Sequence, residues 1–140
     1  DDKVKSDAQI IVARAAFETG DEARAKIAYS KVQNIAKGEL AAEALYYDAY
    51  FKNKEGNFSG SNDVVQNLAK NYSSYKYFGA KGLVLMAENF YALNDSFQAT
   101  YILENVIKNF TDYPQVVADA KTSLDKIKTE EAKTNSSITK

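Results

Sequence analysis

The sequence predicts an all-α fold in which three helical hairpins and a final capping helix stack into a solenoid. Three observations carry this prediction. Turn residues recur at Gly20, Gly56 and Asn94, which lie 36 and 38 residues apart, and a period of roughly 20–50 residues is typical of stacked repeats. Apolar residues between the turns recur at helical spacing. Residues of matching size also stand at fixed offsets from each turn.

These offsets describe how the two helices of a hairpin would meet. Seven residues before each turn, and five after it, the side chain is small, whereas nine and twelve after it the side chain is larger and apolar or aromatic. The small residues are Ala13, Ala49, Ala87, Ala25, Ser61 and Ala99, and the larger ones are Tyr29, Val65, Leu103, Val32, Leu68 and Val106. Small residues permit a close approach of two helices, and large ones fill the space beside it.

The first hairpin is predicted over residues 6–37. Its first helix begins at Ser6 and stops before Gly20, since glycine suits the left-handed conformation that ends a helix. Its second helix follows Asp21, a good N-cap, and runs towards Gly38.

The second hairpin is predicted over residues 39–72 and the third over residues 76–110, with residues 73–78 as the link between them. Pro114 then begins a capping helix over residues 114–131, whose apolar stripe is narrow and whose other side is charged. Residues 1–133 are thus expected to form one domain. Residues 134–140 are expected to form a flexible tail, because they carry too little apolar surface to become ordered.

Composition excludes several classes of function. The chain has no His and no Cys, which removes Ser-His-Asp triads, Cys-His pairs, thiol redox centres and the usual zinc sites. A net charge of −1 with mixed signs gives no field that attracts nucleic acid, and no apolar run approaches the roughly 20 residues that span a bilayer. We therefore expect a protein that is not an enzyme, with no cofactor, no metal, no nucleic-acid partner and no membrane insertion.

Two local clusters of the sequence have a functional and a simpler explanation. Tyr72, Tyr75, Tyr77 and Phe78 lie among lysines and suggest an RNA-binding patch, but packing between hairpins explains them better. The acidic residues of the first seven positions lack the spacing of a calcium loop and are expected to be solvated surface.

The pattern resembles the tetratricopeptide repeat, a hairpin of two helices about 34 residues long. The best match is residues 16–21, Ala-Phe-Glu-Thr-Gly-Asp, followed by Ala25 and Tyr29. The third unit also matches, with Asn94 in place of the turn glycine, whereas the second has Asp48 and Lys52 where apolar residues are usual. The resemblance covers nearly the whole chain and implies a right-handed α-solenoid.

A closer resemblance is to the C-terminal repeats of large tetratricopeptide proteins of Bacteroidetes-type bacteria. It rests on Asn71-Tyr72, on Tyr77-Phe78 and on residues 95–99, Asp-Ser-Phe-Gln-Ala. This resemblance implies a protein-binding scaffold in the bacterial cell envelope or periplasm, with the cytoplasm as the alternative.

In this family the first helix of each hairpin lines a concave groove. The residues that the resemblance places there are Arg14, Phe17, Tyr46, Tyr50, Asn53, Lys81, Glu88 and Tyr91. We expect the chain to bind a protein, as a peptide or a partner helix, with Tyr46 and Tyr50 as anchors and with Arg14, Asn53 and Glu88 setting orientation. Two alternatives stay open: these rings belong to the core, or the chain is a structural segment of a larger envelope-associated protein that self-associates.

Overall fold

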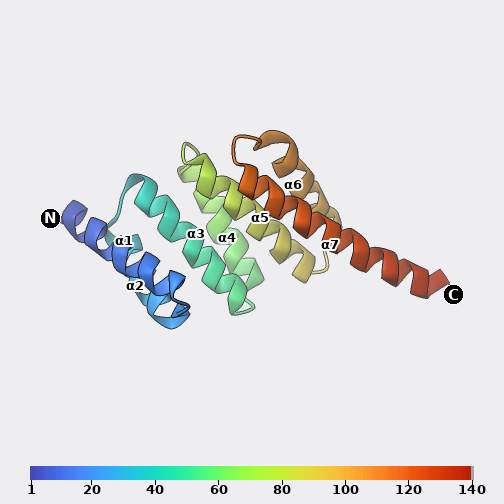
Figure 1. The fold of residues 1–140 in the computed structure, drawn as a ribbon, viewed down its shortest axis with the longest axis horizontal. Helices are drawn as coiled ribbons and strands as arrows, with labels where there is room; N and C mark the ends of the chain where they lie inside the picture. Colours follow the sequence, from blue (N-terminus) through green and yellow to red (C-terminus); the bar gives the residue numbers. More distant parts are fainter. Residues whose placement is uncertain (140) are drawn as a thin grey trace. The chain divides into compact units, whose positions relative to one another are not determined.

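The computed structural model describes residues 1–139, with side chains up to Ser136, and within that range all regular secondary structure is helical. The helices are α1 (Asp2–Glu18), α2 (Glu22–Ile35), α3 (Gly38–Lys54), α4 (Phe58–Asn71), α5 (Lys76–Ala92), α6 (Ser96–Asn109) and α7 (Pro114–Thr139) (Figure 1). The predicted all-α class is confirmed, and described helices pack in pairs: α1 on α2, α2 on α3, α3 on α4, and α6 on α7. The first two predicted hairpins are among these pairs.

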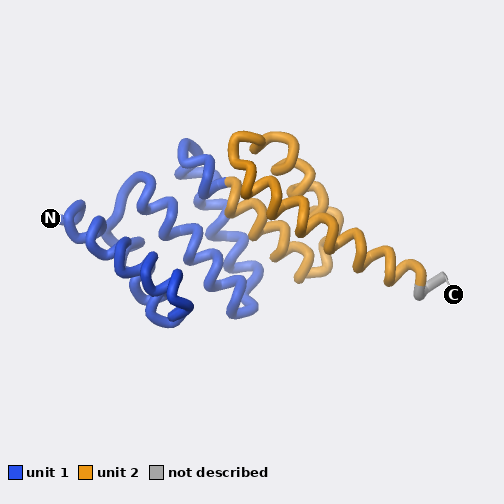
Figure 2. Tube along the Cα trace, in the orientation of Figure 1, with its two compact units in different colours: residues 1–79 blue, residues 80–140 orange. Residues whose placement is uncertain are grey.

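The chain divides into two compact units, Asp1–Gly79 and Ala80–Lys140 (Figure 2). Unit 1 holds α1 to α4 and the first residues of α5, and unit 2 holds the rest of α5 with α6 and the described part of α7. We expected a single domain over residues 1–133. The helices pack mainly on their neighbours along the chain, and their contacts form two clusters with the boundary inside α5.

The three repeat turns share one geometry. Gly20, Gly56 and Asn94 have φ of 83°, 81° and 66°, the left-handed conformation that glycine and asparagine adopt at least cost. In each turn the residue that follows donates its N–H to a carbonyl five positions back, as in the Schellman motif: Asp21 to Ala16, Asn57 to Lys52, and Asp95 to Phe90. The same three residues then cap α2, α4 and α6, each accepting a backbone N–H from three residues ahead.

The small residues predicted at fixed offsets all lie in the interior. Ala13, Ala25, Ala49, Ser61, Ala87 and Ala99 are fully buried, and the larger residues at the matching positions are buried as well. In unit 1, Ala13 and Ala25 belong to one cluster with Tyr29 and Val32, and Leu68 belongs to another. In unit 2, Ala87 and Ala99 belong to a cluster of α5, α6 and α7 with Leu103 and Val106. The offsets therefore mark helix contacts, as the sequence predicted.

The starts of two helices define the starts of the first and third hairpins more closely. α1 begins at Asp2 rather than Ser6, because the Asp1 side chain accepts the N–H of Val4 at 2.9 Å and caps the helix. α5 begins at Lys76, the first residue of the predicted third hairpin, so the link ends before Lys76, and Tyr77 and Phe78 lie in the first turn of α5. Phe78 packs with Ala42, Leu45 and other members of a unit 1 cluster.

The predicted flexible tail is also corrected, because α7 continues to Thr139 instead of ending near residue 131. Adding a residue to an existing helix costs far less than nucleating one, and Ala132 and Lys133 are good helix formers. The Thr134 hydroxyl also donates to the Glu130 carbonyl at 3.1 Å. Residue 140 lies outside the described residues.

Candidate functional site

A buried carboxylate joins the first three helices. Glu43 on α3 is 5% exposed and receives two hydrogen bonds from Arg14 on α1, from Nε at 3.0 Å and from Nη2 at 2.6 Å. The Tyr29 hydroxyl on α2 donates to the same carboxylate at 3.0 Å. Bidentate pairing with a guanidinium and a third donor compensates the cost of burying the charge, so this network fixes the relative positions of α1, α2 and α3.

Burial keeps two phenols of this region protonated. Burial raises the pKa of Tyr29 well above its ordinary value, and the Glu43 charge adds to this effect. Burial likewise raises the pKa of Tyr47, whose ring stacks on Tyr29 with centroids 4.2 Å apart. The hydrogen bond to Glu43 raises the pKa of the Arg14 guanidinium. Both phenols therefore stay neutral at physiological pH and keep their donor protons.

An aromatic face adjoins this network. Phe17 on α1 contacts Tyr47 and Tyr50 on α3 edge to face, with centroids 4.9 and 5.4 Å apart. Tyr46 contacts Tyr47 at 5.0 Å and Phe78 at 6.4 Å. We call Phe17, Tyr46, Tyr47 and Tyr50 the aromatic face of unit 1; all four are partly exposed. Their rings therefore present area to solvent while neighbouring rings hold them in place.

Polar groups surround Tyr50. Its hydroxyl donates to Glu22 on α2 at 3.1 Å, and Lys54 Nζ lies 5.2 Å from its ring centroid, within cation–π range. Asn53, one turn from Tyr50 on α3, is partly exposed, and its backbone carbonyl accepts the N–H of Gly56. These groups give the aromatic face a charged and polar border.

The eight residues predicted for the groove fall into two groups. Arg14, Phe17, Tyr46, Tyr50 and Asn53 lie in unit 1, on α1 and α3. The remaining three, Lys81, Glu88 and Tyr91, lie on α5 in unit 2. Tyr91 donates to Glu130 on α7, and this hydrogen bond raises the Tyr91 pKa. The structure thus gathers the unit 1 residues around the aromatic face, and it pairs Tyr91 inside unit 2.

Sequence reasoning missed Glu43 and Tyr47. A signal for Glu43 was present, because it is the single charge in the apolar run Ala-Ala-Glu-Ala-Leu over residues 41–45. A buried carboxylate needs a partner, and Arg14 is the only arginine of α1. Arg14, expected to orient a partner, is therefore first a structural ion-pair residue.

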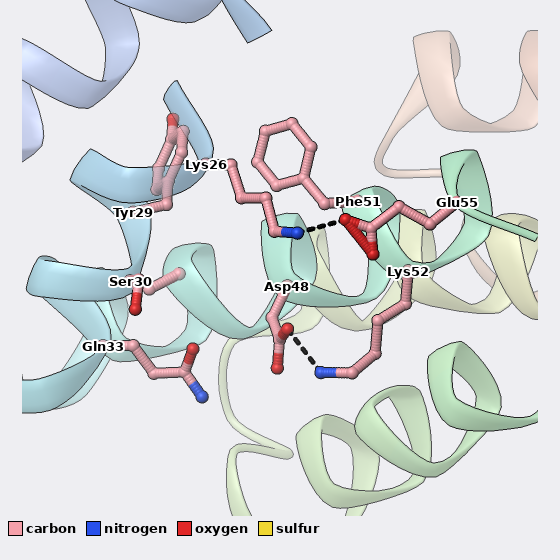
Figure 3. A pocket seen from close by; sticks show the side chains of 9 residues that line it. Lys26, Tyr29, Ser30, Gln33, Asp48, Phe51, Lys52 and Glu55 are labelled. Atoms are coloured by element: carbon pink, nitrogen blue, oxygen red, sulfur yellow. Dashed lines mark hydrogen bonds and ion pairs between the residues drawn. The ribbon is translucent and has the colours of Figure 1, made fainter. Parts of the chain in front are cut away.

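A second feature lies between α2 and α3, where a cavity of about 150 Å³ opens (Figure 3). Its lining residues are Lys26, Tyr29, Ser30, Gln33, Ala44, Asp48, Phe51, Lys52 and Glu55. Lys26 pairs with Glu55 across the two helices, and Lys52 pairs with Asp48 at 2.6 Å. The charges that departed from the repeat pattern, Asp48 and Lys52, thus neutralise each other beside this cavity.

The described residues also bear on the acidic and aromatic clusters seen in the sequence. No group of three or more Asp and Glu side chains there is placed to hold a metal ion. None of the described helices combines the length and apolar character needed to cross a bilayer. Within unit 1, Phe78 is buried and Tyr72 and Tyr75 pack against its cluster, while Tyr77 is exposed. Three of the four rings therefore pack in the interior of unit 1, and Tyr77 does not.

No model of a known protein family matches the chain, and no curated protein gives a match. Its function is therefore inferred from its residues and their arrangement.

Proposed function

We propose that this chain is a tetratricopeptide-like, non-catalytic scaffold, part of a right-handed solenoid, that binds a peptide or a helix of another protein. The proposed binding surface in unit 1 is the aromatic face with Arg14 and Asn53 at its border. The observation that carries this proposal is that the four rings are partly exposed and yet fixed by ring contacts of 4.9 to 6.0 Å.

The repeat part of the proposal is supported by the three equivalent turns. Each has a left-handed residue, a Schellman hydrogen bond and a side-chain cap on the helix that follows. Equivalent turns place buried small residues at equivalent offsets. A chain that uses one hairpin geometry three times suits the successive stacking of a repeat protein.

The binding part is supported by energetics. Tyr side chains offer a large contact area with few rotatable bonds, and contacts with neighbouring rings have already restricted those of Tyr46 and Tyr50. A partner would therefore lose less side-chain entropy on binding than it would with mobile surface residues. The Arg14 side chain is 49% exposed and presents charge at the border of the same surface.

A matched pair of tyrosines tests the proposal. A photoreactive phenylalanine analogue placed at position 46 of the full chain should crosslink a partner from the source cells, whereas the same group at Tyr101, which is 60% exposed in unit 2, should not. With the purified partner, Tyr50→Ala should weaken binding at least ~10-fold, the scale of an interface hot spot, and Tyr101→Ala should leave it unchanged.

Folding is controlled by comparing melting temperatures, and Tyr50→Phe, which keeps the ring, should retain most of the affinity. Equal crosslinking from positions 46 and 101, or equal effects of the two alanine variants, would contradict binding at the aromatic face.

The second proposal is a structural segment of a larger envelope-associated protein that self-associates. It is favoured by a separate observation, an exposed apolar stripe on α1, which is developed below.

A further inference from the structure

Helix α1 is apolar on two opposite sides. One side faces the unit 1 core through Ser6, Ile10, Ala13 and Ala16. The opposite side carries Val4, Ala8, Ile11 and Ala15, all exposed to solvent. We call these four residues the α1 stripe. Val4 and Ile11 are 65% and 66% exposed, so nothing in unit 1 covers them.

The spacing of the α1 stripe is that of a helix–helix seam. Its members follow each other at intervals of four, three and four residues over three helical turns, which matches the alternation of a coiled-coil seam. Isolated exposed apolar residues are ordinary on protein surfaces. Four at this spacing, on a helix whose other side already forms core, indicate a surface that packs against another helix.

The sizes of these residues select a second copy of α1 in antiparallel orientation. Along the chain they alternate large, small, large, small: Val4, Ala8, Ile11, Ala15. Read in reverse, the order is small, large, small, large. An antiparallel copy therefore places Val4 opposite Ala15 and Ile11 opposite Ala8, twice each, so that every large side chain meets a small one. A parallel copy in register would place large against large and leave gaps between alanines.

The charges beside the α1 stripe fit the same register. Asp7 and Arg14 border it on one side, at equivalent positions of successive heptads, and the antiparallel register brings Asp7 of each copy close to Arg14 of the other. The present partner of Asp7 is Lys3, in a pair whose side chains are 84% and 53% exposed and which contributes little. The Arg14 guanidinium has five N–H groups, and two of them donate to Glu43.

One contact in this register is unfavourable. Asp1 of each copy would lie near Glu18 of the other, at the two ends of the helix pair. Both residues are exposed, so solvent and salt screen their repulsion. The two central pairs of Asp7 with Arg14, placed beside apolar contacts, outweigh it.

We propose that the α1 stripe is a self-association surface, on which two copies of this chain pair their α1 helices antiparallel about a twofold axis. The surface is small for a stable dimer, so a dissociation constant on the order of 10–100 µM is expected. This proposal rests on the second proposed function and specifies which surface of the chain self-associates. It does not depend on partner binding at the aromatic face.

Two isoleucines of nearly equal exposure provide the first test. Ile11 lies on the α1 stripe, and Ile27 lies on α2 and is 61% exposed. In sedimentation equilibrium between 5 µM and 1 mM, the wild-type chain and Ile27→Asp should show the same monomer–dimer equilibrium. Ile11→Asp should weaken association at least ~30-fold, because a buried charge would replace the central contact. A monomeric wild type at 1 mM, or equal effects of the two variants, would refute the proposal.

Orientation is tested with engineered disulfides, since the chain has no cysteine of its own. In the antiparallel pair, position 4 lies beside position 15 of the second copy, whereas the two copies of position 4 lie about 16 Å apart along the helix axis, beyond disulfide reach. Mixing Val4→Cys with Ala15→Cys under mild oxidation should yield the mixed dimer. Dimers of Val4→Cys alone would indicate a parallel pair, and association with another protein instead of a second copy would equally overturn the proposal.

Discussion

Replacing Arg14 by methionine should destabilise the protein by about 2 kcal/mol. Methionine keeps much of the apolar length of arginine and removes the two donors to Glu43. Breaking a fully buried ion pair costs about 3–5 kcal/mol, and an exposed pair contributes about 0.2–1 kcal/mol. The side chains here are 6% exposed for Glu43 and 49% exposed for Arg14, so an intermediate value is expected: the Glu43 charge stays desolvated, while the lost guanidinium was half solvated.

The assay is urea unfolding followed by circular dichroism, with Glu43→Met and the double variant completing a thermodynamic cycle. Glu43→Met removes the acceptor of the buried Tyr29 hydroxyl and should cost a similar amount. The double variant leaves no buried carboxylate, so it should be less destabilised than the sum of the single variants by about 1–2 kcal/mol. The single variant Arg14→Met should also lower the melting temperature by about 10 °C for a unit of this size.

A change below about 0.5 kcal/mol for Arg14→Met, or strict additivity in the cycle, would show that the network does not hold the three helices together.

Two further predictions address the tyrosines and the turns. Burial raises the pKa values of Tyr29 and Tyr47 in the folded chain. Above about pH 10 these tyrosines ionise in the unfolded chain but stay protonated in the folded one, so the unfolded chain binds fewer protons than the folded chain. The free energy of unfolding therefore falls as pH rises. Tyr29→Phe should make the free energy of unfolding depend less steeply on pH, as measured by urea unfolding between about pH 8 and 11, a range that brackets the ordinary tyrosine pKa. An unchanged pH dependence would contradict the burial of Tyr29. At the turns, Gly56→Ala should lower stability by about 1 kcal/mol because φ is 81°. Asn94→Gly should leave stability unchanged or raise it by a few tenths of a kcal/mol. If thermal melts showed Asn94→Gly to be the less stable variant, left-handed strain would be excluded as the cause.

Much of the fold follows from local patterns. Gly20 and Gly56 end helices because glycine tolerates positive φ, and Asp21 and Asp95 cap helices because a short carboxylate reaches the N–H three residues ahead. Ala13, Ala49 and other small residues could be assigned to helix contacts from their offsets alone. These are effects of one residue on its near neighbours, so the sequence displays them directly.

The helix ends were less predictable. The early start of α1 depends on the Asp1 cap, which apolar periodicity does not reveal. The continuation of α7 through residues 134–139 depends on helix propagation from a segment already held by Val116, Ala120 and Leu124 in the unit 2 core. Composition alone favoured a flexible tail there, because composition does not show that a helix formed by the preceding residues extends into this segment.

By itself, the sequence determined the helical class, the three repeat turns and the buried small residues, since these depend on interactions between residues close along the chain. Only the tertiary structure decided that Arg14 pairs with Glu43, that Tyr47 stacks on Tyr29, and that some apolar residues of α1 are buried while others are exposed. Contacts between α1 and α3 join residues almost 30 positions apart, and the local pattern of either helix is compatible with many such pairings. Packing of whole helices selects one of them, and that selection places the aromatic face and the α1 stripe.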